Sequence, residues 1–429
     1  MTIRRLTSFI YAAAVICVFI SCATHSYDAL DAEVRGGQYE KAYADIQKDK
    51  KSVYGSDSVR YYLDSGLVAH YAGMHKESTS LLENGDRAIE DAFTKSITQN
   101  IASFIANDNT KEYAGEDYEN LYVNIFNSLN YYHLGKLEDA MVEIRRMQEK
   151  LKNLSVKYNV IEKKLANEDA KAAAKTKGGV NFTNSALARY LSMLFYRARG
   201  SYDDARIDCD AIKTAYRDYK NIYNYPLPSS IDGELNIADG QARLNVLAFS
   251  GLAPAKVQDT LRIPLYVTNS WIKIALPRMV KRPSDIGAIE IAFDNGKRFR
   301  LELLEDIQNV AIETFKKHQG LIEAKSIIRA TVKGGATAGF MAAGEDNPTL
   351  KLIGVGLQVM TELTERADLR IVRYFPARAY AGGITVEPGE YNFAVSYFGL
   401  SGHEIASFKY DNFKISKDSL NLVETFLLK

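Results

Sequence analysis

The stretch GKLEDA, residues 135–140, contains the pattern that decides the fold of the first half of this 429-residue chain. A glycine is followed by a long or aromatic residue two positions later and by a small residue five positions later, and the same pattern begins at Gly37, Gly73 and Gly200. Glycine can end a helix in a tight turn without a Cβ clash, and the acidic residues after it favour the positive start of the next helix. The small residue lets the two helices approach closely. The pattern therefore predicts a series of helical hairpins.

These hairpins resemble tetratricopeptide repeats, whose period is about 34 residues. The interval from Gly37 to Gly73 is close to one period, and each of the next two intervals is close to two. We therefore expect a tetratricopeptide-like α-solenoid over residues 22–225. Within it, residues 167–181 combine Lys-Ala repetition with a Gly-Gly pair, which indicates an exposed linker or insertion.

After Tyr225-Pro226 the hydrophobic periodicity shifts toward two, which is typical of strands. Asn295-Gly296 lies between two alternating apolar runs and is a strong short-range signal for a β-hairpin. A helical hairpin is expected within residues 305–366. The segments expected to form strands are 243–249, 260–266, 271–276, 288–293, 297–303, 369–374 and 391–397, with one or two more within 412–428. The expected fold class is α+β with several domains: the N-terminal α-solenoid, then a β-rich α+β module over residues 226–429.

The N-terminus predicts export. Residues 1–21 are typical of a signal peptide, because two arginines precede an apolar run that is shorter than the roughly 20 residues of a membrane span. The sequence FISC, residues 19–22, resembles the lipobox of bacterial lipoproteins, although Phe19 stands where that family usually has leucine. The resemblance implies that Cys22 becomes the first residue and receives lipid. An ordinary secretory signal or an uncleaved anchor are the alternatives.

The location within the envelope follows by analogy. Ala23 and Thr24 do not resemble the acidic signal that retains some lipoproteins at the inner membrane. We therefore expect an exported, lipid-anchored protein at the outer membrane, facing the periplasm, in contact with the membrane through lipidated Cys22.

Composition narrows the function classes. A formal net charge of +1 gives no reason to expect nucleic acid as a partner. After removal of the signal and lipidation of Cys22, Cys209 is the one remaining cysteine, so no intramolecular disulfide is expected and a buried thiol is favoured. The sequence contains no phosphate-binding loop, CxxC pair, HExxH or GxSxG motif, and its six histidines are scattered. Neither a cofactor, a metal nor a catalytic site is therefore predicted.

One charged cluster is a candidate for partner binding. Its members follow Gly135 at helical spacing, which lets Glu143 reach Arg146 one turn later. The cluster either lines a groove for a partner or forms a solvated or inter-helix ion-pair network, and the second interpretation is favoured. The candidate residues are Glu138, Asp139, Glu143, Arg145 and Arg146.

Several blocks, taken in their order along the chain, carry a wider resemblance. They are Tyr118-Glu119, Asn130-Tyr131, Gly135, Glu138-Asp139-Ala140, Glu143-Ile144-Arg145-Arg146, Gly251-Leu252-Ala253-Pro254-Ala255-Lys256, Ala367-Asp368-Leu369-Arg370, Phe375-Pro376-Ala377 and Pro388-Gly389-Glu390-Tyr391. This order resembles a family of bacterial tetratricopeptide-like lipoproteins. The family has no established biochemical activity, and some members accompany lipoproteins that activate penicillin-binding proteins, which is an implication by association only.

The expected function is therefore that of a membrane-anchored scaffold. Its helical repeats would bind other envelope proteins, in cell-envelope or peptidoglycan assembly. Two alternatives stay open: a cell-wall hydrolase without a short signature, and a carrier of a small or lipidic ligand, each with its site in the C-terminal module.

Overall fold

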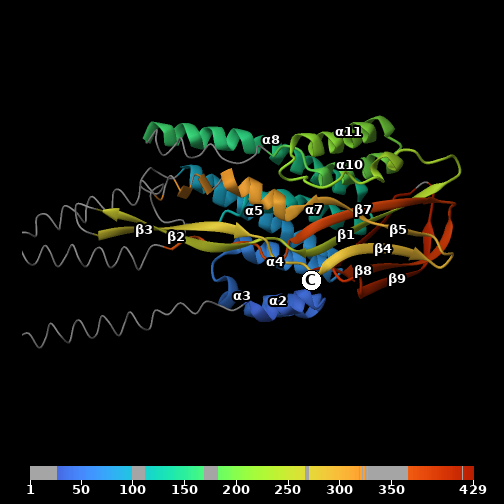
Figure 1. Ribbon diagram of the computed structural model, residues 1–429, viewed down its shortest axis with the longest axis horizontal. Helices are drawn as coiled ribbons and strands as arrows, with labels where there is room; N and C mark the ends of the chain where they lie inside the picture. Colours follow the sequence, from blue (N-terminus) through green and yellow to red (C-terminus); the bar gives the residue numbers. More distant parts are fainter. Residues whose placement is uncertain are drawn as a thin grey trace, which may run out of the picture.

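A computed structural model describes residues 27–98, 112–168, 182–265, 270–317, 366–417 and 419–429, together with 319, 320, 322, 323 and 326. The described chain is helical in its first half and rich in strands in its second half, as the sequence predicts for an α+β fold. In Figure 1, α10 and α11 lie along one edge of the molecule and α2 and α3 along the opposite edge, with strands between them.

The predicted helical hairpins are present. They pair α2 (Asp28–Arg35) with α3 (Tyr39–Tyr54), α4 (Ser58–Tyr71) with α5 (His75–Thr98), α7 (Asp117–His133) with α8 (Leu137–Glu168), and α10 (Ala186–Ala198) with α11 (Tyr202–Asp218). The four motif glycines, Gly37, Gly73, Gly135 and Gly200, have φ between 71° and 74°. In each turn the next residue donates to a carbonyl five positions earlier, as Lys136 N–H does to Tyr131 at 2.8 Å. These are Schellman turns, in which glycine avoids the steric cost of left-handed backbone.

In the α4–α5, α7–α8 and α10–α11 hairpins the first helix is more buried than the second. In α4, α7 and α10 most side chains are buried, including polar ones. A helix that is buried all round must be covered on both sides. The second helices, such as α3 and α11, bury one stripe and expose the rest. The small motif residues Ala42, Ser78, Ala140 and Ala205 are all buried where the paired helices meet.

Within the described residues the strands form three sheets. One has the order β10-β1-β7-β6, with β1 (Ala242–Leu252), β6 (Glu302–Asp306), β7 (Pro376–Val386) and β10 (Asn421–Leu427), and β10 runs parallel to β1. The second has the order β5-β4-β8-β9, with β4 (Ile286–Phe293), β5 (Arg298–Arg300), β8 (Gly389–Gly399) and β9 (Glu404–Ile415). The strands β2 (Ala255–Leu265) and β3 (Ser270–Val280) form a ribbon that extends toward one end of the molecule (Figure 1).

Strand β1 lies at the centre of the layers, and all of its residues are buried. Leu247 and Phe249 join a large hydrophobic core that also contains side chains of every helical hairpin. Val246 and Ala248, which point to the opposite face, join a second core with the sheet of β4 and β8. The helices and the first sheet therefore share one core across residue 226.

Three boundaries need correction or fall outside the described chain. Residues 369–374, expected to be a strand, belong to no sheet. The helix expected from 305 begins at residue 307, because 302–306 form β6, and the rest of the expected hairpin lies mostly outside the described residues. Helix α8 continues to Glu168, and residues 169–181 of the expected linker are not described.

The hairpin predicted at Asn295-Gly296 is confirmed, because β4 and β5 pair across it and Gly296 has φ of 86°. Cys209 is buried, as expected. Among the described residues, no helix combines the length and the apolar character that a membrane span requires.

Candidate functional site

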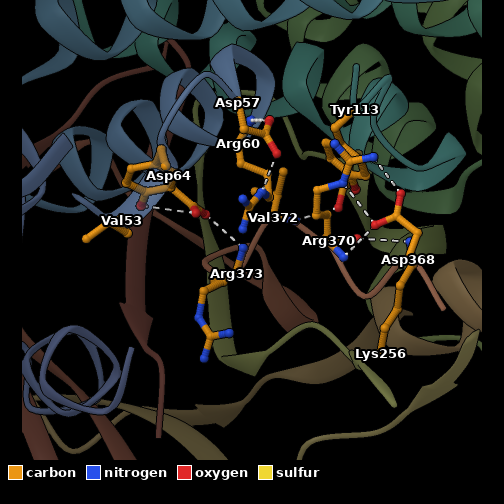
Figure 2. A network of polar contacts seen from close by, with 12 residues as sticks. Val53, Asp57, Arg60, Asp64, Tyr113, Lys256, Asp368, Arg370, Val372 and Arg373 are labelled. Carbon is orange, nitrogen blue, oxygen red and sulfur yellow. Dashed lines mark hydrogen bonds and ion pairs between the residues drawn. The ribbon is translucent and has the colours of Figure 1, made fainter. Parts of the chain in front are cut away.

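The strap, which we define as residues 367–375, crosses the helical hairpins just before β7. Its residues belong to no sheet, so its buried N–H and C=O groups need partners from elsewhere. Those partners come from α4 and α7, from β2 and Ala253 just before it, and from Arg282 after β3. Figure 2 shows Asp64 and Lys256 near opposite ends of the strap.

Carboxylates on two helices accept hydrogen bonds from successive amides of the strap. Glu119 on α7 accepts from the Val372 N–H at 2.7 Å, and Asp64 on α4 accepts from the Arg373 N–H at 2.7 Å. The Tyr71 hydroxyl donates to the Tyr374 carbonyl at 2.9 Å. The helices therefore bind this segment by its backbone, as a receptor binds an extended peptide.

Lys256, the second residue of β2, joins the strap to the helices from the other side. Its ammonium donates to the Arg370 carbonyl at 2.9 Å and forms an ion pair with Glu116 at the start of α7. Both side chains of this pair are buried. A buried ion pair is retained only where additional hydrogen bonds satisfy its remaining atoms, and here the strap carbonyl supplies one.

The two carboxylates that hold the strap are electrostatically unusual. Burial, together with the nearby charge of Glu116, raises the pKa of Glu119 to about 8, and hydrogen bonds from the strap and from Tyr113 oppose this. Burial likewise raises the pKa of Asp64 to about 7, against the opposing charges of Arg373 and Arg60. The site therefore holds two groups whose charge can change near neutral pH.

The strap side chains divide between salt bridges and the core. Arg370 pairs with Asp368 at 2.7 Å and lies over the Tyr113 ring, and Arg373 pairs with Asp31 on α2. Val372, Tyr374 and Phe375 are fully buried. Burying three such side chains stabilises the strap by several kcal/mol, at about 1.5–3 kcal/mol each.

The sequence-predicted charged cluster divides between a network and the surface. Glu143 is buried and accepts from Asn124 at 2.7 Å and from Arg146 at 3.0 Å. Arg146 also donates to Asp86 of α5 at 2.8 Å. These residues therefore tie α8 to α7 and α5.

The other members lie apart from that network. Glu138 pairs with Arg199 at 3.0 Å, and both groups are exposed. Asp139 and Arg145 are exposed. The favoured interpretation of the cluster, an inter-helix network, describes Glu143 and Arg146, and the five residues do not gather in one place.

Two further buried carboxylates fasten the sheet to the helices. Glu305 of β6 accepts from the hydroxyls of Tyr122, Tyr223 and Ser185, the last two at 2.5 and 2.9 Å. Glu234 accepts from Arg197 and Arg243, each at 2.8 Å. Each of these carboxylates is surrounded by donors, so it serves as a structural acceptor.

Among the described residues, no three His, Cys, Asp or Glu side chains are arranged to hold a metal ion. The expectation that the histidines are scattered is wrong for three of them. His70, His75 and His133 come together, because the Gly73 turn and the end of α7 bring distant positions side by side.

No short motif marks the strap site, but three of the sequence blocks that carry the family resemblance lie in it. These blocks are Tyr118-Glu119, the block ending at Lys256 and the block beginning at Ala367.

No protein-family model matches this chain, and no curated protein or solved structure is significantly similar to it.

Proposed function

We propose that this chain is an envelope lipoprotein, anchored through Cys22, that acts as a protein-binding scaffold built on a tetratricopeptide-like α-solenoid. One observation supports the proposal above all: the helical hairpins hold a segment that belongs to no sheet by its backbone amides, through Glu119 and Asp64. Recognition of extended chain is what such repeats offer a partner.

The chain itself covers the inner face of the hairpins, which is formed by α4, α7 and α10. The strap, β10 and β1 lie against α4, α7 and α10, so a partner would meet the second helices instead. Val142 on α8 and Ile207 on α11 are 46% and 64% exposed. We therefore assign partner binding to the outer face of α8 and α11.

The anchor would hold this scaffold close to the bilayer. Only four residues separate Cys22 from Tyr27, where the described chain begins. A fully extended chain spans at most about 3.6 Å per residue, so the spacer reaches no more than roughly 18 Å. Two or three acyl chains at about 0.8 kcal/mol per buried methylene would make attachment effectively permanent.

The anchor is tested by feeding cells a radioactive fatty acid. The wild-type chain and the Cys209→Ala control should incorporate label and sediment with membranes, whereas Cys22→Ala should do neither. Label that persists in Cys22→Ala would contradict the anchor.

The scaffold is tested with a photo-crosslinking amino acid placed at Ile207 or Val142 in intact cells. Leu400, which is 79% exposed in the turn after β8, is the matched control position. We expect a crosslink to one defined envelope protein from the helical positions and not from Leu400, and that protein should bind the purified chain. Identical crosslinks from all positions, or none, would overturn the assignment.

A further inference from the structure

Tyr27, from which only four residues lead back to Cys22, is fixed against the helices on several sides. Its hydroxyl donates to the Val53 carbonyl at 3.2 Å and accepts from the Arg60 guanidinium at 2.9 Å. The guanidinium of Arg373 lies over its ring, 4.3 Å from the centroid. The spacer to the anchor therefore leaves the folded chain at a fixed place, beside the C-terminal end of α3.

Three exposed lysines lie on the last two turns of α3, next to this exit point: Lys48, Lys50 and Lys51. Lys51 is one turn before Tyr54, whose ring packs against that of Tyr27 with 6.5 Å between the centroids. In the described part of the chain, no ion pair joins any of the three lysines to a carboxylate. We call these three residues the lysine surface.

The charges around the exit point favour the lysines. The last two turns of α3 contain one acidic residue, Asp49, beside the three lysines. Two acidic groups at the same end of the hairpins are already neutralised, Asp31 by Arg373 and Asp57 by Arg60. A net positive charge is therefore exposed where the spacer to the anchor begins.

The opposite edge of the molecule carries the opposite charge. Helix α11 contains five aspartates and three basic residues. It lies along the edge away from α2 and α3 (Figure 1). An anionic surface therefore attracts the end of α3 and repels α11.

We propose that the lysine surface docks on the anionic headgroups of the membrane that holds the anchor, so that the outer face of α8 and α11 points away from the bilayer. The inference rests on the proposed function, because it requires lipid on Cys22. A spacer of at most roughly 18 Å keeps the headgroups close to Tyr27 and the lysines beside it. Each lysine near an anionic bilayer strengthens binding about fivefold, and the attraction falls off within about 8 Å at physiological ionic strength.

Short-range quenching tests this orientation in the lipidated full-length chain. A dye is attached to one added cysteine, Ser52→Cys or Ile207→Cys, in the Cys209→Ala background, and the chain is placed in vesicles whose headgroups carry a nitroxide quencher. Ser52 is exposed between the lysines and the exit point. In vesicles of phosphatidylcholine and phosphatidylglycerol we expect quenching of the dye at residue 52 and not at residue 207. In phosphatidylcholine alone, the quenching at residue 52 should fall.

Removal of two charges tests the role of the lysines. Lys48→Gln/Lys51→Gln should lower the equilibrium constant for docking by roughly 25-fold and reduce the quenching at residue 52 to its level in phosphatidylcholine. Lys50 is kept, because its ammonium lies 3.8 Å from the centroid of the Tyr61 ring and contributes to packing. Added salt should reduce the same quenching without any substitution, because it screens exposed charges.

The matched control is Lys213→Gln/Lys220→Gln, which removes two exposed lysines from α11 and the turn after it and should leave the quenching unchanged. Equal quenching at residues 52 and 207, or quenching at residue 52 that does not depend on phosphatidylglycerol or on the two α3 lysines, would overturn the docking. The mass of the purified chain separates this result from failure of the anchor. A chain without lipid on Cys22 would overturn the anchor and the docking together, whereas a lipidated chain that fails these comparisons overturns the docking alone.

Discussion

Lys256 and Glu116 form an ion pair buried between the sheet-forming half of the chain and its helical half, with side chains only 3% and 4% exposed. The pair also fixes the strap, because the lysine ammonium donates to the Arg370 carbonyl. Two charges removed from water at this junction make it sensitive to the loss of either partner.

Lys256→Met should lower the free energy of unfolding by about 3–5 kcal/mol, because the buried Glu116 carboxylate would lose its ion pair with this ammonium. Arg278→Met is the matched control, since it breaks the pair with Asp259, in which both groups are about half exposed. That change should cost no more than about 1 kcal/mol. Urea denaturation measures both, and equal losses would contradict the importance of the buried pair.

Gly135→Ala should destabilise the chain by about 1–2 kcal/mol, because φ of 72° strains any residue with a Cβ. Gly389→Ala serves for comparison: its φ is not positive and an added Cβ would meet Tyr391 at an ordinary 3.7 Å. Thermal melting should show little change for Gly389→Ala. If the two variants melt alike, the turn at Gly135 does not depend on glycine.

Stability should decrease as pH rises toward 8. Asp64 and Glu119 have pKa values of about 7 and 8 in the folded chain, above those of an unfolded one, so their contribution is complete below about pH 4 and is lost as pH rises through those values. Each proton that is bound in the folded state but not in the unfolded state lowers the free energy of unfolding by about 1.4 kcal/mol for each unit that the pH rises. Asp64→Asn should flatten the slope between pH 4 and 7, whereas Asp259→Asn should not.

Glu305→Ala should cost about 3 kcal/mol or more, because the hydroxyls of Tyr122, Tyr223 and Ser185 would lose a buried acceptor. Glu302→Ala, three residues earlier on the same strand, removes an acceptor near the surface and should cost far less. Guanidinium denaturation compares the two. Similar denaturation midpoints for the two variants would show that water accepts the hydrogen bonds that the Glu305 carboxylate accepts in the wild type.

Local signals explain what the sequence predicted well. The turn at Gly135 and the hairpin at Asn295-Gly296 depend on residues within a few positions of each other, and the structure contains both. A positive φ at glycine can be read from spacing because few other residues tolerate it.

Partners far apart in the chain explain what could not be predicted. Residues 367–371 of the strap alternate apolar and polar side chains as a strand does, but the strap amides bond to Glu119 and Asp64 instead of a neighbouring strand. A period of two specifies an extended backbone and does not specify its partner. For the same reason, the meeting of His70 with Glu424 has no local signal.

The pairing of β1 with β10 has a consequence for biosynthesis. Leu244 on the central strand faces Asn421, so the first sheet lacks one neighbour of β1 until residues 421–427 have left the ribosome. Until then a strand that is buried along its whole length in the folded chain stays uncovered along one edge, in a state prone to aggregation. A premature stop codon that removed even the final ten residues would therefore leave a nascent product suited to chaperone binding or proteolysis.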